Sequence, residues 1–342
     1  MISGTGSVIQ GHSTAFSAAR PDKRRVFVMQ FTAAFAPQSS ASLMEAPRKV
    51  SAPRRLRFLG AEGFDVYNIS TPFSCGGRTY IAGRVEKREN ELSFVRLFEQ
   101  SGEDEYTAVF PDLSFHRLQD PFVTKVQDEI VLGGVQIVTH PLDDSRIISW
   151  QTLFFKGKTP EELKLFAVGP SCMKDIRLCE LADGRIAVLT RPQGKKGGKG
   201  KIGFTVLERL KDLCADTILD AAIDSSYFLP EEWGGANEIH LLKNGLLGVA
   251  GHIACRTAEG LHYRSMAFVL DPATGMHSPL RILACRGDIS SAPASKRPDL
   301  MDVLFTGGVV RHGNGLATLY TGVSDCESWR AEIPDPFAAF ED

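Results

Sequence analysis

The sequence lacks an excess of charge of either sign. Its 342 residues include 39 Lys and Arg against 41 Asp and Glu, which gives a net charge of −2 at pH 7. Such a balance provides no overall electrostatic field to hold nucleic acid or an anionic membrane, so any anion site must be local. We therefore expect no nucleic-acid partner.

Long apolar runs are absent as well. No stretch approaches the roughly 18 residues that span a bilayer, and residues 1–28 lack the apolar core of a secretory signal. That first stretch is rich in Ser, Ala and Gly with a few Arg and Lys, which faintly resembles a transit peptide. We interpret it as a loosely ordered extension and predict one domain over residues 29–342, beginning with a strand after Met29 and without a membrane partner.

Cysteine pairs are missing too. The seven cysteines are scattered and show no Cys-x-x-Cys spacing, which indicates reduced structural thiols rather than a disulfide framework or a zinc site. Reduced thiols are typical of a cytoplasmic protein. The chain also contains no Asp-x-Asp motif for a divalent cation and no Walker loop, so neither a metal nor a cofactor is expected.

What the chain does contain is an internal repeat. Five times, a tight-turn signal precedes a run of β-forming or small apolar residues that ends in Gly, Arg or His, and such turns are a strong hairpin signal. The turns recur at intervals of about 51 to 70 residues, which is slightly longer than the repeat length of common propeller blades. The repeated strands are predicted at residues 80–84, 130–134, 186–191, 246–252 and 316–322.

The repeat predicts an all-β fold, a five-bladed β-propeller with a central funnel. Further strands are predicted at 94–98, 147–155, 202–207 and 263–270. Apolar residues recur at helical spacing between Leu207 and Ile223, so that segment is predicted to be a helix. A ring of four-stranded sheets places its innermost strands around the funnel, and polar residues that end the repeated strands should converge there.

Asp120 is the candidate for the reactive group. It precedes Pro121 at the start of an apolar strand. Proline has a fixed φ and no backbone donor, and it biases the residue before it toward an extended conformation. A carboxylate at this point can be held rigidly, although an ordinary Asp-Pro turn is a frequent way to enter a strand.

A set of short motifs follows the order of the predicted blades. They lie at residues 66–73, 82–86, 119–122, 174–175, 191–192, 251–252 and 320–325. In that order they resemble the motifs of the inverting β-mannoside phosphorylases, over roughly residues 55–330. The Gln-Asp-Pro-Phe variant, the basic stretch 191–200 and the Gly-His-Ile-Ala at 251–254 resemble more closely the dual-activity β-1,2-mannosyltransferase/phosphorylases that turn over the mannan called mannogen.

The resemblance implies a five-bladed propeller that transfers mannose with anomeric inversion. The partners it implies are a β-1,2-linked oligomannoside, phosphate, and mannose 1-phosphate or GDP-mannose. In such enzymes one Asp is the general acid and passes its proton through a hydroxyl of the mannosyl ring, and Asp120 matches this Asp. The sugar-binding residues assigned by the same match are Asn68, Arg84 and Asp325, with Asp65 and Glu238 as further funnel carboxylates for which structural turn roles remain an alternative.

The chemistry of the residues agrees with phosphorolysis. Phosphate is itself an anionic nucleophile, whereas inverting hydrolysis needs a second carboxylate about 6.5 to 9.5 Å away to activate water. Phosphoryl oxygens are held best by Arg and Lys, and His can contribute near neutral pH. The predicted phosphate- or donor-binding residues are Lys174, Asp175, Arg191, His240, His252 and Lys199, with solvated charges and a core histidine as the alternative reading.

The basic, glycine-rich loop 193–201 has two readings. Its backbone amides and lysines could contact a diphosphate, or it could be a mobile hairpin tip. Two residues depart from the phosphorylase pattern: Phe122 replaces an Arg and His240 replaces a Lys. Both changes remove fixed positive charge near the phosphate, so phosphorolysis is predicted to be the weaker activity.

Two other classes of function stay open at this point. A glycoside hydrolase of the same superfamily would use Asp65, Asp175, Glu238 or Asp325 as a base opposite Asp120. A non-catalytic propeller that binds partners on its rim would be favoured if Asp120, Lys174 and Arg191 did not face one cavity.

Overall fold

The computed structural model describes Met1 and residues 35–290 and 294–341. The remainder of the predicted extension at 1–28 and the strand expected after Met29 therefore lie outside the described residues. Within the described ranges no helix is long and apolar enough to cross a membrane.

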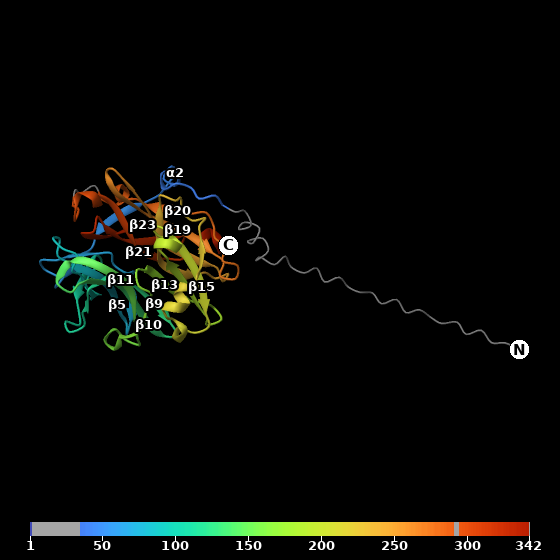
Figure 1. The fold of residues 1–342 in the computed structure, drawn as a ribbon, viewed down its shortest axis with the longest axis horizontal. Coiled ribbons are helices and arrows are strands. Elements are labelled where there is room, and N and C mark those ends of the chain that lie inside the picture. Colours follow the sequence, from blue (N-terminus) through green and yellow to red (C-terminus); the bar gives the residue numbers. More distant parts are fainter. Residues whose placement is uncertain (2–34, 291–293, 342) are drawn as a thin grey trace. The chain divides into compact units, whose positions relative to one another are not determined.

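The described residues form an all-β fold, as the sequence predicts (Figure 1). The strands form four hydrogen-bonded sheets, and a short parallel pairing joins two antiparallel groups in the largest of them, so five groups of mainly antiparallel strands follow one another along the chain. The first two groups contain β2 (Arg57–Leu59), β3 (Asp65–Tyr67), β4 (Phe73–Cys75), β5 (Arg78–Glu86), β6 (Phe94–Gln100), β7 (Glu105–Ala108) and β8 (Phe115–His116), then β9 (Leu118–Val126), β10 (Glu129–His140), β11 (Asp143–Gly157) and β12 (Lys164–Val168).

The other three strand groups repeat the four-strand pattern. The third contains β13 (Lys174–Glu180), β14 (Ile186–Arg191), β15 (Ile202–Leu207) and β16 (Ala222–Asp224). The fourth contains β17 (Trp233–Leu241), β18 (Leu247–Thr257), β19 (Gly260–Leu270) and β20 (Arg281–Ala284). The fifth contains β21 (Asp302–Arg311), β22 (Leu316–Val323), β23 (Glu327–Pro334) and, paired antiparallel with β23, the early strand β1 (Ser51–Arg55).

Helices are short in this fold. They are α2 (Ser40–Leu43), η1 (Pro160–Glu162), α3 (Gly194–Gly197), η2 (Leu210–Asp212), α4 (Ala215–Leu219), α5 (Arg286–Ile289), η3 (Pro298–Leu300) and η4 (Ala338–Phe340). The prediction of one helix over 207–223 is wrong: β15 ends at Leu207, and only η2 and α4 follow before β16. The apolar residues of this stretch instead join a buried cluster beside β13 and β14.

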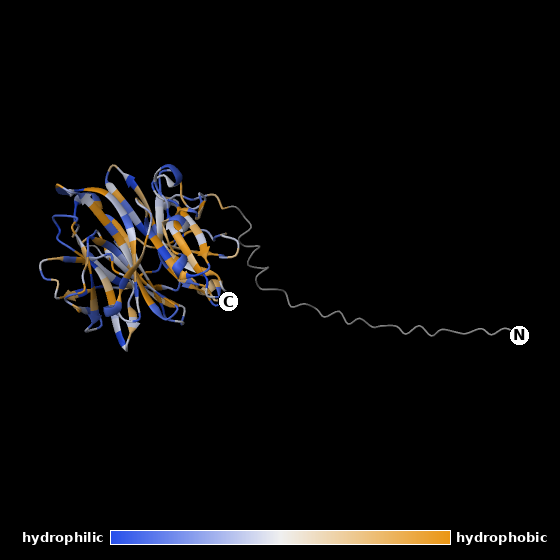
Figure 2. Ribbon diagram, turned by 60° about the horizontal axis from the view of Figure 1, so that its bottom comes forward, coloured by the Kyte–Doolittle hydropathy of each residue, from blue (hydrophilic) through white to orange (hydrophobic). Residues whose placement is uncertain are grey.

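The predicted repeat corresponds to β5, β10, β14, β18 and β22. Each is the second strand of its group when counted from the strand that it follows and pairs with, which is β3 in the first group. Glycines at the turns, such as Gly184, Gly245 and Gly315, have φ values of 84°, 85° and 81°, a region in which a side chain would be strained. The strands that follow them are β14, β18 and β22. Apolar side chains concentrate along the strands and hydrophilic ones in the connecting loops (Figure 2).

The core lies between successive strand groups. One buried cluster joins Leu97 of β6 to Leu118 and Leu132 of the second group. Three similar clusters join the second group to the third, the third to the fourth, and the fifth to the first. A buried cluster therefore lies between four of the five successive pairs of groups, and parallel pairing of β19 with β21 joins the fourth group to the fifth.

Both the first strands and the repeated strands contact the neighbouring groups; in the first group these are β3 and β5. Strand β9 contacts β5 and β13, β13 contacts β17, β17 contacts β21, and β3 contacts β22 and β23. This succession closes on itself, and Figure 1 shows β9 and β13 side by side. The site is therefore built from the first strands as well as from the ends of the repeated strands, where it was expected.

A β-bulge interrupts each first strand at a corresponding position. In β9, Asp120 and Pro121 lie opposite the single residue Gly134, and β13, β17 and β21 show the same irregularity. The chain after β3 contains a similar bulge. Tyr67 pairs with Arg84 and the Ser70 amide donates to the Ala82 carbonyl, so two residues, Asn68 and Ile69, lie opposite the single residue Gly83. Bulges re-aim side chains next to active sites. The residues at these bulges are Asn68, Asp120, Asp175, Asn237 and Gly307.

Candidate active site

Asp120 adopts a strained backbone conformation at its bulge. Its φ is +49°, so the extended conformation expected before Pro121 is wrong. Asn68, Asp175 and Asp325 share this feature, with φ values of 45°, 56° and 52°. Positive φ is uncommon outside glycine, and such residues cluster at functional sites when the surrounding structure holds them in place. The short Asn and Asp side chains tolerate it best.

The Asp120 carboxylate is buried and held through one oxygen. Asn68 Nδ2 donates to Asp120 Oδ1 at 2.9 Å, and Arg84 Nη1 donates to the same oxygen at 3.2 Å. Asp120 is 7% exposed. Its Oδ2 accepts no hydrogen bond from the residues that the structure describes, so this oxygen is available to exchange a proton with a substrate.

Arg84 is itself held by a buried network that the motifs do not indicate. Its guanidinium donates to Glu86 at 2.8 and 3.1 Å and to Glu91 at 3.1 Å. Tyr67 Oη donates to Glu86 at 2.6 Å, and Lys296 Nζ forms ion pairs with both glutamates. These contacts fix the cation that positions Asp120.

Asp325 lies close enough for its charge to act on Arg84 and Asp120. Burial raises the pKa of Asp325 to about 6, and the nearby negative charge of Asp120 adds to the rise, while Arg84 opposes it. The predicted sugar-binding residues Asn68, Arg84 and Asp325 are thus brought together around Asp120.

A second buried cluster lies on the neighbouring strands β13 and β14. Asp175 accepts from Arg191 Nη1 at 2.5 Å, and both side chains are almost completely buried. His252 Nε2 lies 3.8 Å from the same carboxylate, and His252 Nδ1 lies 2.8 Å from Asn237 Oδ1. Although burial opposes it, Arg191 holds the pKa of Asp175 well below its usual range. Lys174 pairs in register with Arg191.

This second cluster presents unpartnered polar atoms. Arg191 Nε, Asn237 Nδ2 and His252 Nε2 are buried and have no hydrogen-bond partner among the described residues. Burial lowers the pKa of His252 to about 3, so its ring is neutral at pH 7 and acts by hydrogen bonding rather than by charge. Buried polar groups normally have partners. Because His252 Nδ1 donates to Asn237 Oδ1, the neutral ring leaves Nε2 as an acceptor, and the orphaned donors are Arg191 Nε and Asn237 Nδ2. These two donors, together with the charges of Arg191 and Lys174, form a site suited to an anion.

Arg177 connects the two clusters. It is buried on β13, donates through Nε to the Asn237 carbonyl at 2.7 Å, and stacks over the Phe122 ring at 4.4 Å. Its charge interacts with those of Asp175 and Asp120. Phe122 therefore does not leave the site without a fixed cation, because it supports an arginine from the adjacent strand.

The basic loop 193–201 packs directly on the anion cluster. Arg191 Nη2 donates to the Lys199 carbonyl at 3.5 Å, and a Cβ at Gly200 would lie 2.4 Å from Arg191 Nε. Only glycine fits at position 200. The Lys199 ammonium lies over the Trp233 ring at 5.4 Å, and Lys195 and Lys196 are exposed.

Three predicted site residues lie elsewhere. Asp65 forms two 2.8 Å hydrogen bonds with Arg88, separate from the Asp120 contacts. Glu238 accepts from Thr71 at 2.6 Å and from the Val309 amide at 2.7 Å. It also lies 2.8 Å from His240 Nε2, and although burial opposes it, Glu238 raises the pKa of His240.

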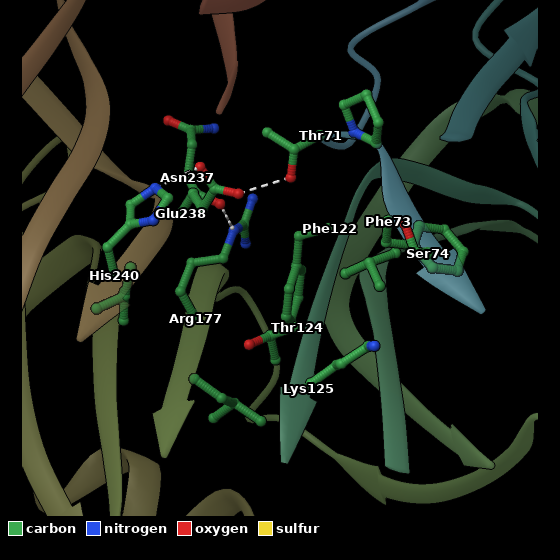
Figure 3. A pocket seen from close by; sticks show the side chains of 14 residues that line it. Thr71, Phe73, Ser74, Phe122, Thr124, Lys125, Arg177, Asn237, Glu238 and His240 are labelled. Carbon is green, nitrogen blue, oxygen red and sulfur yellow. Dashed lines mark hydrogen bonds and ion pairs between the residues drawn. The ribbon is translucent and has the colours of Figure 1, made fainter. Parts of the chain in front are cut away.

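Glu238 and His240 line a cavity of about 250 Å³ further along the first strands (Figure 3). The figure shows Arg177 directed toward Asn237 and Glu238, with His240 on the opposite side of Glu238. The partners of His240 among the described residues are Glu238 and the Phe337 ring, not Arg191 or Asp175. The structure therefore does not bring Asp65, Glu238 and His240 into the two clusters.

Several residues of these clusters were missed by sequence reasoning. Asn237 could have been found as the counterpart of Asp120 and Asp175 in the repeat. Glu86 lies two residues after Arg84 and could have been recognised as its partner. The others, Glu91, Lys296 and Arg177, carry no local signal. As for metals, no group of three or more His, Cys, Asp or Glu side chains in the described part of the chain is arranged to hold an ion.

Comparison with known proteins places this architecture. A family model described as a protein of unknown function, DUF1861, matches residues 42–339. The chain belongs to this family. A comparison with curated protein sequences gives no significant match.

Solved structures similar to this DUF1861 chain are more informative. A mannose phosphorylase from Leishmania mexicana, MPT-4 in complex with phosphate ion, is 36% identical with a TM-score of 0.81, over 89% of this chain and 94% of that one. MPT-1, a GDP-Man-dependent mannosyltransferase from the same organism, is 33% identical with a TM-score of 0.79, over 88% and 95%. The chain is a member of the family of these enzymes, as its motifs indicated.

A more distant similarity supports the fold alone. The β-1,2-mannobiose phosphorylase from Listeria innocua is 15% identical with a TM-score of 0.58, over 80% of this chain and 91% of that chain.

Proposed function

We propose that the protein transfers mannose between β-1,2-linked oligomannosides and either phosphate or GDP-mannose, with inversion at the anomeric carbon. That it is an enzyme follows from its membership of a family of mannosyltransferases and mannoside phosphorylases. The single observation that carries the proposal is the pairing of the two clusters: a carboxylate with one free oxygen beside a buried anion site with unpartnered donors.

In the phosphorolytic direction, protonated Asp120 is the general acid. Its proton passes through a mannosyl hydroxyl to the glycosidic oxygen, which leaves with the bonding electron pair as that bond breaks. A phosphate oxygen attacks the anomeric carbon from the opposite face and forms α-mannose 1-phosphate. In synthesis the steps reverse, and the Asp120 carboxylate takes the proton of the acceptor hydroxyl.

The anion cluster would hold the phosphoryl group. Arg191 and Lys174 supply charge and Asn237 Nδ2 supplies a hydrogen bond, which suits charge-assisted recognition of phosphoryl oxygens, while His252 holds the Asn237 amide through Nδ1. Loop 193–201 lies against Arg191 and would contact the diphosphate of GDP-mannose. Since the cations of the protein can neutralise a diphosphate directly, we propose that no metal is required.

The geometry disfavours hydrolysis. A hydrolase would need a carboxylate free to activate water, but Asp175 is ion-paired to Arg191 and Glu238 is occupied by Thr71, Val309 and His240. Asp65 is paired with Arg88. Asp325 is the one candidate base that remains, and its charge acts on the Asp120 cluster itself rather than across the site.

We also propose that the five strand groups are the five blades of a propeller. The closed succession of contacts from β3 to β21 and back supports this count, as does a bulge at a corresponding position in each group. Strand β1 would then complete the last blade.

The test is a synthesis assay. The protein is mixed with mannose and either α-mannose 1-phosphate or GDP-mannose, and β-1,2-linked oligomers are sought by chromatography and NMR. We expect oligomers with at least one donor. Asp120→Asn keeps the shape and the tolerance for positive φ, so it should fold normally and lose about 10²- to 10⁴-fold in both directions. Activity of this variant within threefold of the wild type would contradict the assignment.

A further inference from the structure

The buried cluster around Asp120 contains more acidic than basic groups. Its cations are held by carboxylates on two sides, and almost no water reaches them: the side chains of Arg84, Glu86 and Lys296 are 5%, 0% and 3% exposed. The carboxylates are Glu86, Glu91, Asp120 and Asp325, and the buried cations are Arg84 and Lys296.

Arg84 is shared between three carboxylates. It donates to Glu86, to Glu91 at 3.1 Å and to Asp120 at 3.2 Å. The interaction with Asp120 is the longest of these. The electrostatic interaction of Arg84 with Asp120 should therefore be stronger when another cation neutralises Glu86 and Glu91.

Lys296 is that other cation. It arrives from the segment between α5 and β21, and its amide donates to the Ser324 carbonyl at 2.9 Å, next to Asp325. Its ammonium pairs with Glu86, lies 3.3 Å from Glu91 and 3.4 Å from Tyr67 Oη. Asp120 is not among its hydrogen-bond or ion-pair partners in the described part of the chain.

We propose that Lys296 is a positioning residue of the active site: by neutralising Glu86 and Glu91 it leaves the Arg84 guanidinium for Asp120 and thereby sets the proton affinity of the general acid. Its effect on the acid is indirect, because its own ion pairs are with Glu86 and Glu91. The inference rests on the proposed function for its catalytic consequence, but its electrostatic part can be measured without any substrate.

Removal of the Lys296 charge should raise the proton affinity of the general acid. Without Lys296, Glu86 has Arg84 as its remaining cation and Glu91 keeps only Arg84 and the half-exposed Arg297, so less of the Arg84 charge is left for Asp120 and the acid should hold its proton to higher pH. An opposite charge close to a carboxylate lowers its pKa by about 1 to 3 units, and an effect passed on through Arg84 should lie at the lower end of that range. The other charges that act on the acid are those of Asp325 and Arg177, while Tyr67 lies against Arg84. The half-exposed Arg297 pairs with Glu91 at 2.8 Å, and its charge also acts on Asp325.

The experiment compares four variants. Lys296→Met removes the charge, and Lys296→Gln removes it while keeping a hydrogen-bond donor, in case the methionine variant does not fold. Lys296→Arg keeps the charge, and Arg297→Gln is the matched control on the neighbouring residue. The pH profile of kcat/KM for phosphorolysis of β-1,2-mannobiose is measured, and carboxyl titration is followed by NMR of protein labelled with ¹³C-Asp.

In both charge-removing variants, the pH at which kcat/KM falls through loss of the acid's proton should rise by about one unit or more. The titration midpoint of the Asp120–Asp325 pair should rise by a similar amount. Lys296→Arg and Arg297→Gln should stay within a few tenths of a unit of the wild type. Unchanged titration in folded Lys296→Met or Lys296→Gln would overturn the inference, as would an equal shift in Lys296→Arg. If the wild type transferred no mannose, the proposed function would fail, and the carboxyl titration alone would decide on Lys296.

Discussion

Replacement of Asp325 by asparagine should stabilise the protein while it lowers activity. Burial raises the pKa of Asp325 to about 6 in the folded state, against about 3.9 for an unfolded chain. The folded protein thus binds a proton that the unfolded chain releases between these values. At pH above 6 the ionised carboxylate therefore destabilises the fold, and this cost disappears as the pH falls toward 4.

The magnitude follows from the difference between the two pKa values. About two units at 1.36 kcal/mol each give a penalty of about 3 kcal/mol at pH 8 and about 1 kcal/mol at pH 4.5. Asparagine resembles the protonated acid in shape and tolerates the positive φ of 52° at this position. Asp325→Asn should therefore gain more stability at pH 8 than at pH 4.5.

Urea unfolding of the wild type and the variant at both pH values measures the difference. Other titrating groups, such as His252, affect both proteins and cancel in the comparison. Asp65→Asn is the matched control, because it breaks an ion pair with partly exposed Arg88 and should change stability by no more than about 1 kcal/mol. A loss of stability in Asp325→Asn at pH 8, or an equal gain at both pH values, would refute the reasoning.

Three further outcomes are expected. Lys174→Ala should weaken phosphate binding measured by calorimetry by roughly 10- to 100-fold and leave neutral mannobiose binding unchanged, and equal losses would mark the residue as structural. Arg191→Ala should additionally destabilise the fold by about 3 to 5 kcal/mol in urea unfolding, because it leaves Asp175 buried and unpaired; normal stability would contradict the buried pair. Mannosyl transfer should continue in the presence of a chelator, and dependence on added magnesium would contradict this. Replacement of Lys195, Lys196, Lys199 and Lys201 by serine should weaken the use of GDP-mannose more than the use of mannose 1-phosphate. Equal loss with both donors would contradict that expectation.

Much of the fold could be predicted because the signals are local. A turn glycine at positive φ followed by β-branched and small apolar residues is specified within a few positions, and β14 and β22 begin where the sequence indicated. The helix expected over 207–223 failed for the opposite reason. Its apolar spacing is created by tertiary packing of Leu210, Leu213 and Ile218 into the core beside β13, which a local pattern cannot distinguish from a helix.

The site was predictable where a motif lies on the chain and not where partners come from distant segments. Asn68, Arg84 and Asp120 were found by their motifs and do meet. Lys296 lies 210 positions from Glu86, so nothing near either residue signals their contact. His240 was assigned from its place before a repeated strand, but the bulge at Asn237 intervenes and His240 lies beside Glu238.

The bulges explain why this fold concentrates strained acids and amides in one place. A regular strand alternates its side chains between two faces, so consecutive functional groups would diverge. An extra residue in each first strand interrupts this alternation, and at Asn68, Asp120 and Asp175 it takes a positive φ, which Asn and Asp tolerate better than other residues that have side chains. Because each group repeats the device, Asp120 and Asp175 reach the site from adjacent strands. Asp120 is the proposed general acid, while Asp175 anchors the arginine of the anion cluster.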